Sequence, residues 1–523
     1  MSLLKNVSTI GGLTLVSRIF GFARDMLLAR VLGAGGVADA WQLAFQLPNI
    51  FRRLFAEGAF AQAFVPLFNR RMKEDDDITE ARRFAEEVAA FMIPVLIVFS
   101  ALALLAMPWI MGLFASEGLK ADATRFDLGV TMARVAFPYL AFMSLATLLA
   151  GVLNSLSRFA AAAAAPTLLN LCLITALIIG ANLDGSEAAK QQTGLMLAIA
   201  VSVSGLLQLL WLWFWMLRAG FRISPRRPRV TGGVKELGIL ILPAVFGAGV
   251  YQISRFIDLF FLSILPDKSI TFLAMADRLN QLPLGIIGIA LGTAILPSLS
   301  RMIARDENGD AARLQGNAVE LALLLTLPAA VALFIAGDAF TRAFYTGGAY
   351  TLADSLATGA VVSGLVVGLP AYVLVKVLVP NFFARKDTRT PVITAAISLA
   401  LNVGLNLLLV PRLGVVGLAL AGSIAAWSNC AMLYALLAMR GHFRISAVSL
   451  GRIGRIAIAA ALMGVVLHYA MPLGDVWFTG GVLERIGSII ALVAAGGITF
   501  FAAAFALGVV NRRVFDQLRR RPA

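Results

Sequence analysis

The side chains that could do chemistry lie between residues 11 and 68, where charges interrupt two apolar runs separated by the glycine-rich residues 33–36. Each run is long enough to cross a bilayer, which takes about 20 residues. Because one charge at the centre of a membrane costs about 2.5–3.5 kcal/mol, these charges are not expected to face lipid. We expect them to line a water-filled cavity. The charged residues are Arg18, Arg24, Asp25, Arg30, Asp39, Arg52, Arg53 and Glu57.

Cations exceed anions in this stretch, so the expected cavity is basic. The guanidinium fork matches phosphate oxygens, which makes a cargo with a phosphate or pyrophosphate group the best fit. The predicted cargo-binding arginines are Arg18, Arg24, Arg52 and Arg278. The candidate site also includes Arg53 and the acids Asp25, Asp39 and Glu57, which partly neutralise the arginines.

Two other interpretations of these charges stay open. Any one of them could form an ion pair between helices that only stabilises packing. Arg30 and Arg53 could extend along an apolar surface to reach the membrane interface.

A second group of polar residues lies deep in apolar segments. Asp258 is in one segment, and Asn402 and Asn406 are one helical turn apart in another. Oxygen ligands around a carboxylate could hold Na⁺ or carry a proton. Hydrogen bonding between helices explains the same residues equally well.

No motif in the sequence indicates catalysis. The chain has no G-x-S-x-G, no phosphate-binding P-loop and no H-E-x-x-H, so we expect no enzyme and no bound cofactor. With no nucleotide-binding module, transport would use an ion gradient such as Na⁺, the membrane potential or the cargo gradient.

The composition is that of a multi-pass membrane protein. Of the 523 residues, 59% are hydrophobic and 14% are charged. The net charge of +15 could suggest nucleic acid, but the basic residues lie in short linkers between apolar segments, as the positive-inside rule expects. We therefore expect no nucleic-acid partner, surrounding membrane lipids, and both termini in the cytoplasm.

Apolar segments of membrane-spanning length recur about fourteen times. The expected spans are 7–32, 37–67, 85–115, 128–155, 160–182, 193–218, 236–265, 270–300, 315–345, 353–383, 390–410, 414–439, 452–472 and 482–510.

The chain also repeats itself. Ser17-Arg18 followed by Gln46-Leu47-Pro48 has a counterpart in Ser254-Arg255 followed by Gln281-Leu282-Pro283. The repeat predicts two pseudo-symmetric six-helix lobes with the same orientation, a transporter signature that places the substrate between the halves. The predicted parts are residues 1–220, residues 235–440, and two further C-terminal helices in residues 450–512.

Four long motifs resemble the MurJ (MviN) family of lipid II flippases, which belongs to the multidrug/oligosaccharidyl-lipid/polysaccharide exporter superfamily. The similarity extends over essentially the whole chain. The motifs are RIFGFARDMLLARVLGAG (18–35), LPNIFRRLFAEGAFAQAFVP (47–66), ADRLNQLPLGIIGIALGTAILPSLS (276–300) and VKVLVPNFFARKDTRTPV (375–392).

The resemblance implies two lobes in a V and the flipping of lipid II, an undecaprenyl-pyrophosphate-linked disaccharide pentapeptide, to the outer leaflet during peptidoglycan synthesis. It also implies that residues 450–512 form a groove for the polyprenyl tail. From the resemblance we further expect an inner-membrane location in a bacterium and a monomer. The family's cavity arginines match Arg18, Arg24, Arg52 and Arg278, and its acidic positions match Asp25 and Asp39.

A sodium site of the family resembles Asp258, Asn402 and Asn406. Two positions depart from the family pattern: Gln281 stands where some members have an acid, and Asn406 stands where others have Asp.

Two rival functions remain. A related exporter could carry another polyprenyl-linked oligosaccharide or a cationic drug, although a drug cation would favour an acidic or aromatic cavity over this basic one. A membrane scaffold would tolerate loss of the cavity arginines.

Overall fold

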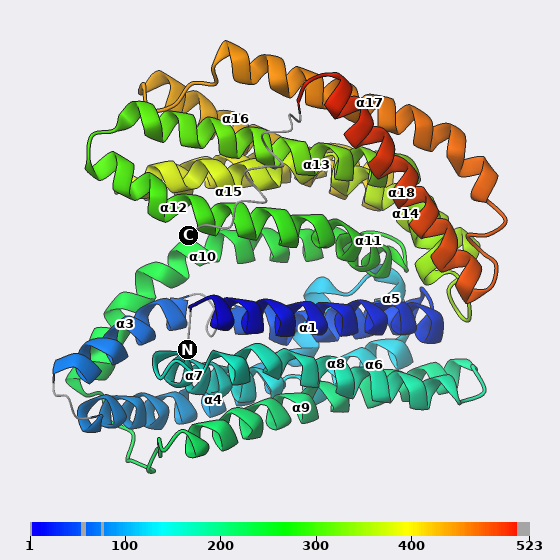
Figure 1. The fold of residues 1–523 in the computed structure, drawn as a ribbon. Coiled ribbons are helices and arrows are strands. Elements are labelled where there is room, and N and C mark those ends of the chain that lie inside the picture. The colour runs from blue at the N-terminus through cyan, green and yellow to red at the C-terminus, as the bar shows by residue number, and fades with distance from the viewer. Residues whose placement is uncertain (1–2, 54–58, 75–77, 510–523) are drawn as a thin grey trace. The chain divides into compact units, whose positions relative to one another are not determined.

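The computed structural model describes residues 3–53, 59–74 and 78–509. Within these ranges the chain forms helices and no β-strand (Figure 1). The predicted all-α class is therefore confirmed. Contacts divide the chain into two compact units, residues 1–271 with 348–350 and residues 272–347 with 351–523.

The first unit contains ten helices in its described residues, most of them connected by short turns. They are α1 (Leu3–Leu32), α2 (Gly36–Arg52), α3 (Ala59–Glu74), α4 (Thr79–Phe114), α5 (Glu117–Ala121), α6 (Ala123–Ala136), α7 (Tyr139–Ser155), α8 (Phe159–Ala181), α9 (Glu187–Arg218) and α10 (Gly232–Ser263).

The helix α11 begins in the first unit and continues into the second, where it runs into a short π-helical turn, η2. The π turn follows directly after Pro283, which has no N–H to donate to the helix. The second-unit elements are α11 (Ser269–Pro283), η2 (Leu284–Gly288), α12 (Ile289–Ala304), α13 (Asn308–Tyr345), α14 (Leu352–Val366), α15 (Leu369–Ala384), α16 (Arg389–Met439), α17 (Ala447–Gly474) and α18 (Val482–Ala506).

The described helices agree with most of the expected spans. Nine segments are long and apolar enough to cross a membrane. One of them, α16, has 51 residues and would measure about 77 Å, more than twice the bilayer core of about 30 Å. It divides at Gly414, whose φ of +57° suits glycine, and so supplies two spans. The other predicted spans fall on helices of the described residues, namely α1, α2, α3, α10, α11 and α12.

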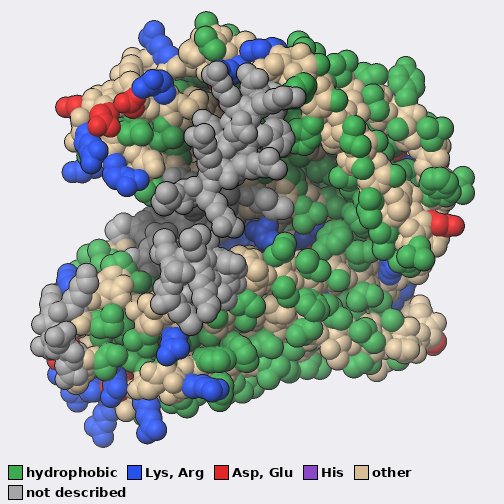
Figure 2. Space-filling model, in the orientation of Figure 1, with side chains coloured by type: hydrophobic (Ala, Val, Ile, Leu, Met, Phe, Trp, Pro, Cys, Tyr) green, Lys and Arg blue, Asp and Glu red, His purple; other side chains and the backbone are tan. Residues whose placement is uncertain are grey.

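Apolar side chains on the outside of the helices fit this assignment. Leu105, Trp109 and Leu483 are 69%, 76% and 85% exposed, which is favourable in lipid but not in water. Hydrophobic side chains cover wide parts of the visible flank of each unit, whereas Lys and Arg gather mainly toward one end of the helices (Figure 2). The protein is a multi-pass membrane protein, as predicted.

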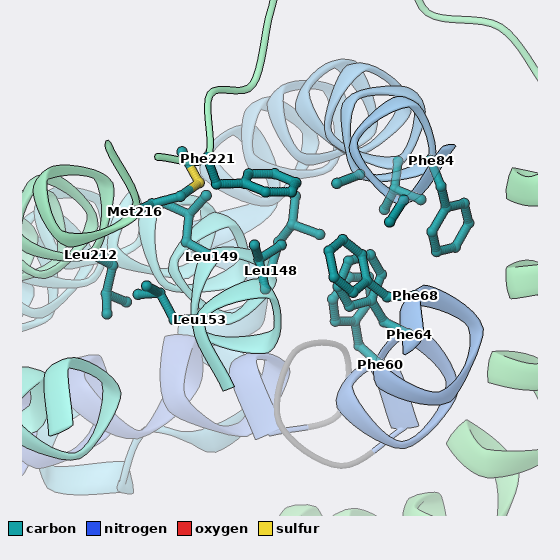
Figure 3. Packing of buried hydrophobic residues seen from close by; sticks show 14 of the residues in the cluster. Phe60, Phe64, Phe68, Phe84, Leu148, Leu149, Leu153, Leu212, Met216 and Phe221 are labelled. Carbon is teal, nitrogen blue, oxygen red and sulfur yellow. The ribbon is translucent and has the colours of Figure 1, made fainter. Parts of the chain in front are cut away.

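An aromatic core holds α3 against its neighbours in the first unit (Figure 3). Phe60, Phe64 and Phe68 recur every four residues, so they share one face of α3. The Phe64 ring stacks on Phe84 of α4 with centroids 5.5 Å apart, and Phe68 contacts Phe221 at 5.8 Å. This core sets the position of the helix that follows the candidate residues of α2.

The helix α10 packs on the first unit, although the repeat places its sequence at the start of the second half. Arg70 and Arg71 of α3 both pair with Glu236 of α10, at 2.5 and 2.8 Å. The repeat-based halves and the contact-based units are thus different divisions of the same chain.

Asp39 anchors the start of α11 to α2. Its carboxylate is fully buried and accepts hydrogen bonds from Lys268 N at 2.6 Å, Thr271 N at 2.9 Å and Thr271 Oγ1 at 2.5 Å. A negative charge at a helix N-terminus satisfies amides that have no partner within the helix. A second hydrogen bond holds the same segment. Asp267, which precedes Lys268, accepts it from Ser116 Oγ at 2.7 Å.

We predict that Asp39→Asn loosens this anchor, because the new NH₂ group meets donors where the carboxylate offered acceptors. Hydrogen bonds to charged groups contribute about 1.5–3 kcal/mol, so amide exchange over residues 264–275 should accelerate about 10-fold or more in hydrogen-exchange mass spectrometry. Asp127→Asn, at an exposed position of α6, should leave that exchange unchanged. Equal exchange in wild type and Asp39→Asn would contradict the anchoring role.

A second prediction concerns the crossing of α13 and α14. A Cβ added at Gly359 would lie 2.7 Å from Asp338 Cα, so Gly359→Ala must separate the helices and should cost about 1–3 kcal/mol of stability. The control Gly404→Ala has open space around its new Cβ and should melt no lower than wild type. Thermal unfolding of the detergent-solubilised protein measures both, and equal melting of the two variants would rule out this close contact.

Candidate functional site

Arg24 forms a buried ion pair with its neighbour Asp25. Both groups are almost inaccessible, with 8% and 4% of their surface exposed. Arg24 donates from Nε at 3.0 Å and from Nη2 at 2.7 Å, both to Asp25 Oδ1. Breaking a buried pair by removing one partner typically costs about 3–5 kcal/mol, because the other charge stays buried without compensation. The pair therefore fixes the side of α1 that can be buried.

A third residue, Asn170 of α8, completes this network. Arg24 Nη1 donates to Asn170 Oδ1 at 2.9 Å, and Asn170 Nδ2 donates to the backbone oxygen of Ser17 at 2.9 Å. The Phe45 ring of α2 lies over the guanidinium, with its centroid 5.9 Å from Cζ. Three helices of the first unit thus hold one arginine.

Arg24 keeps part of its donor capacity. A guanidinium has five N–H donors, and the protein uses three of them. The two other N–H groups have no acceptor within the described residues. An anion could therefore bind Arg24 without first displacing Asp25 or Asn170.

The other predicted first-unit residues differ in their surroundings. Arg18 is half-buried on α1 and Arg53 is exposed at the end of α2. Arg52 is half-buried and donates from Nε to Asn49 Oδ1 at 3.3 Å. Glu57 lies outside the described residues. Asp39, predicted as part of the cargo site, is fully buried in the anchor of α11.

Arg278 lies half-buried on α11 in the second unit. Next to it, Asp277 accepts a hydrogen bond from Gln281 Nε2 at 2.5 Å. Gln281, where some family members have an acid, thus acts here as a donor that supports Asp277.

Lys376 is a cationic residue that the sequence analysis missed. It lies in the apolar helix α15, half-buried. A Cβ at Gly288 of η2 would lie 3.1 Å from Lys376 Cδ, so the lysine packs against the π-helical turn. Such turns occur frequently at functional sites. A single lysine within VLVKVLVP was the available signal.

The predicted cation ligands belong to different units. Asp258 lies on α10 in the first unit, and Asn402 and Asn406 are buried on α16 in the second. Asn406 Nδ2 donates to Asn402 Oδ1 at 3.2 Å, while Asn406 Oδ1 is buried and has no hydrogen-bond partner in the described structure. An oxygen without a donor suits a hard cation such as Na⁺. Among the described residues, no cluster of three or more His, Cys, Asp or Glu could hold a metal ion.

The second unit contains an apolar cavity of about 260 Å³ between α13, α17 and α18. The wall on α13 includes Ala336, whose non-helical backbone marks a kink in that helix. Gly496 and Gly497 of α18 leave space on the opposite side. Further lining residues are Pro328, Met463, Leu492 and Phe501.

Comparison with known proteins identifies the family. The family model described as "Lipid II flippase MurJ" matches residues 28–487. The probable lipid II flippase MurJ of Rhizobium meliloti (strain 1021) is 43% identical over 97% of this chain and 94% of its own length. The lipid II flippase MurJ of Burkholderia cenocepacia is 32% identical over the full length of both chains.

Solved structures support the same fold. A structure titled "Lipid II flippase MurJ, inward closed conformation" matches with a TM-score of 0.77 at 23% identity, over 98% of this chain and 99% of that one. An inward-facing multidrug transporter of the MATE family matches with a TM-score of 0.63 at 15% identity, over 81% and 94%. With the full-length sequence matches, these findings show that the chain belongs to the lipid II flippase MurJ family.

Proposed function

We propose that this protein moves lipid II from the cytoplasmic to the outer leaflet of the bacterial plasma membrane for cell-wall synthesis. The observation that carries the proposal is the presence of arginines in membrane-spanning helices of a chain that matches curated lipid II flippases over its full length. The two N–H donors of Arg24 that have no acceptor among the described residues are suited to an anion, and lipid II carries a pyrophosphate.

The binding roles follow from the chemistry of the cargo. Arg24 would bind pyrophosphate oxygens through paired charge-assisted hydrogen bonds, and Arg18, Arg52 and Arg278 would add positive charge. Lys376 is a further candidate for this role. The undecaprenyl tail would occupy the apolar cavity between α13, α17 and α18, where burial of CH₂ groups contributes about 0.8 kcal/mol each.

The halves 1–220 and 235–440 would open the cargo site to the two sides of the membrane in turn. Residues 450–512 would hold the polyprenyl tail. The protein would work as a monomer with both termini in the cytoplasm, where its basic linkers are expected. It catalyses no covalent step in this scheme, and the membrane potential or Na⁺ would provide the driving force. Where Na⁺ binds, the unpartnered Asn406 Oδ1 and its neighbour Asn402 would supply oxygen ligands.

No observation favours the rival cargoes. The drug-transporter match at 15% identity concerns the fold alone, and a cationic drug would be repelled by the predicted arginines.

We predict that Arg24→Ala and Arg278→Ala each slow lipid II translocation in proteoliposomes about 10- to 100-fold. The reason is the loss of a charge-assisted hydrogen bond, which contributes about 1.5–3 kcal/mol. Neither variant should sustain growth of a bacterium depleted of its own flippase. The control Arg313→Ala, whose side chain is exposed and pairs with Asp310 three residues earlier, should support normal growth and translocation. Wild-type rates in both site variants, at equal membrane levels, would refute cargo binding by these arginines.

We also predict that Gly497→Phe fills the apolar cavity and weakens binding of full-length lipid II about 10-fold. Binding of a lipid II analogue with a short prenyl chain should stay unchanged, because that analogue lacks the long tail that the cavity would hold. Gly487→Phe is the matched control: it adds the same ring to α18 at an exposed glycine away from the cavity. Microscale thermophoresis in detergent measures each affinity. Equal affinities of the two variants for full-length lipid II would exclude the cavity as the tail site.

A further inference from the structure

We propose that Asn170 is a positioning residue for Arg24: it holds the guanidinium so that two N–H donors remain available to the anionic group of the cargo. The inference rests on the proposed function and extends it to a residue on α8 that the family resemblance did not supply. Its basis is the hydrogen-bond geometry around Arg24.

The guanidinium is held at two separate places. Asp25 Oδ1 accepts from Nε and Nη2, while Asn170 accepts from the remaining nitrogen, Nη1. A single carboxylate oxygen leaves the group able to pivot about that oxygen. The contact from Asn170 removes this freedom, and the Phe45 ring lies over the guanidinium.

Asn170 is itself held in one orientation. Its Nδ2 donates to the Ser17 backbone oxygen, two turns before Arg24 on α1, and its side chain is buried. Exchanging the amide oxygen and nitrogen would place two donors face to face at Arg24 and two acceptors face to face at Ser17. The amide therefore accepts from Arg24 with its oxygen and donates to Ser17 with its nitrogen, in one orientation.

The neutrality of Asn170 is as important as its geometry. Asp25 already balances the charge of Arg24, so the pair as a whole is neutral. A second carboxylate at position 170 would keep an acceptor for Arg24 but would make the site negative and repel an anion. An amide orients the arginine without this cost.

The test is a double-mutant cycle on the full-length protein in detergent, with lipid II and farnesyl pyrophosphate as the binding probes. We expect Asn170→Ala to weaken both probes about 10-fold. In the Arg24→Ala background, Asn170→Ala should have no further effect, because a positioning residue acts only through the residue it positions. The inference would be overturned if the affinity losses of the two single variants multiply in the double variant. It would also be overturned if Asn170→Ala binds both probes with wild-type affinity.

Asn170→Asp separates positioning from a merely structural role, and it serves as the second variant if Asn170→Ala does not fold. A structural role predicts that Asp, which can pair with Arg24, retains more affinity than Ala. Positioning of an anion site predicts that Asp binds both probes at least as weakly as Ala, with a melting temperature no lower than that of Ala. The opposite order of affinities would refute the proposal.

The control is Gln208→Leu, which removes a buried amide of α9 whose hydrogen bond stays within its own helix. It should bind both probes as wild type does, and a comparable loss there would count against a specific role for Asn170. If wild type itself binds neither probe, the proposed function fails together with the inference. If wild type binds and Asn170→Ala binds equally well, only the inference fails.

Discussion

The ion pair between Arg24 and Asp25 is the interaction on which the arrangement of the first unit depends. Charges within a bilayer must be compensated where they lie, because no water is available to solvate them. Asp25 provides the charge and Asn170 provides a further acceptor, so α1 must lie against α8 with this side inward. Packing of α1 on α8 is thus a consequence of where the charges fall in the sequence.

The same constraint divides the helices into two kinds. Long apolar helices such as α4 and α18 expose Leu and Trp side chains that lipid can cover. The helices with candidate residues, α1, α2, α10 and α11, bear charges within membrane-spanning lengths. A helix of the second kind is stable only when other protein groups meet its charges, as Asn170 and the start of α11 do for Arg24 and Asp39.

This division explains how much could be predicted from the sequence. Hydropathy and loop charge depend on local residues, so the spans were predicted closely, including the division of α16 near Gly414. The partners of the charges were not predictable in this way. Asn170 is 146 positions from Arg24, and one asparagine in an apolar helix resembles any packing contact. Likewise, the bonds that Asp39 accepts come mainly from backbone amides of Lys268 and Thr271, which no side-chain pattern reveals.

Asp25 and Asp39 are both buried acids, yet their surroundings suit them to different tasks. Asp39 satisfies backbone amides at a helix start, and no incoming group can replace it without leaving those amides unpaired. Asp25 instead pairs with a side chain, Arg24, that keeps two N–H groups without an acceptor among the described residues. A pyrophosphate can accept from these two donors while Asp25 stays in place. Asn170 adds no negative charge, so it holds Arg24 without repelling the anion. A neutral second contact therefore allows a buried arginine to be both stable in the membrane and able to bind an anion.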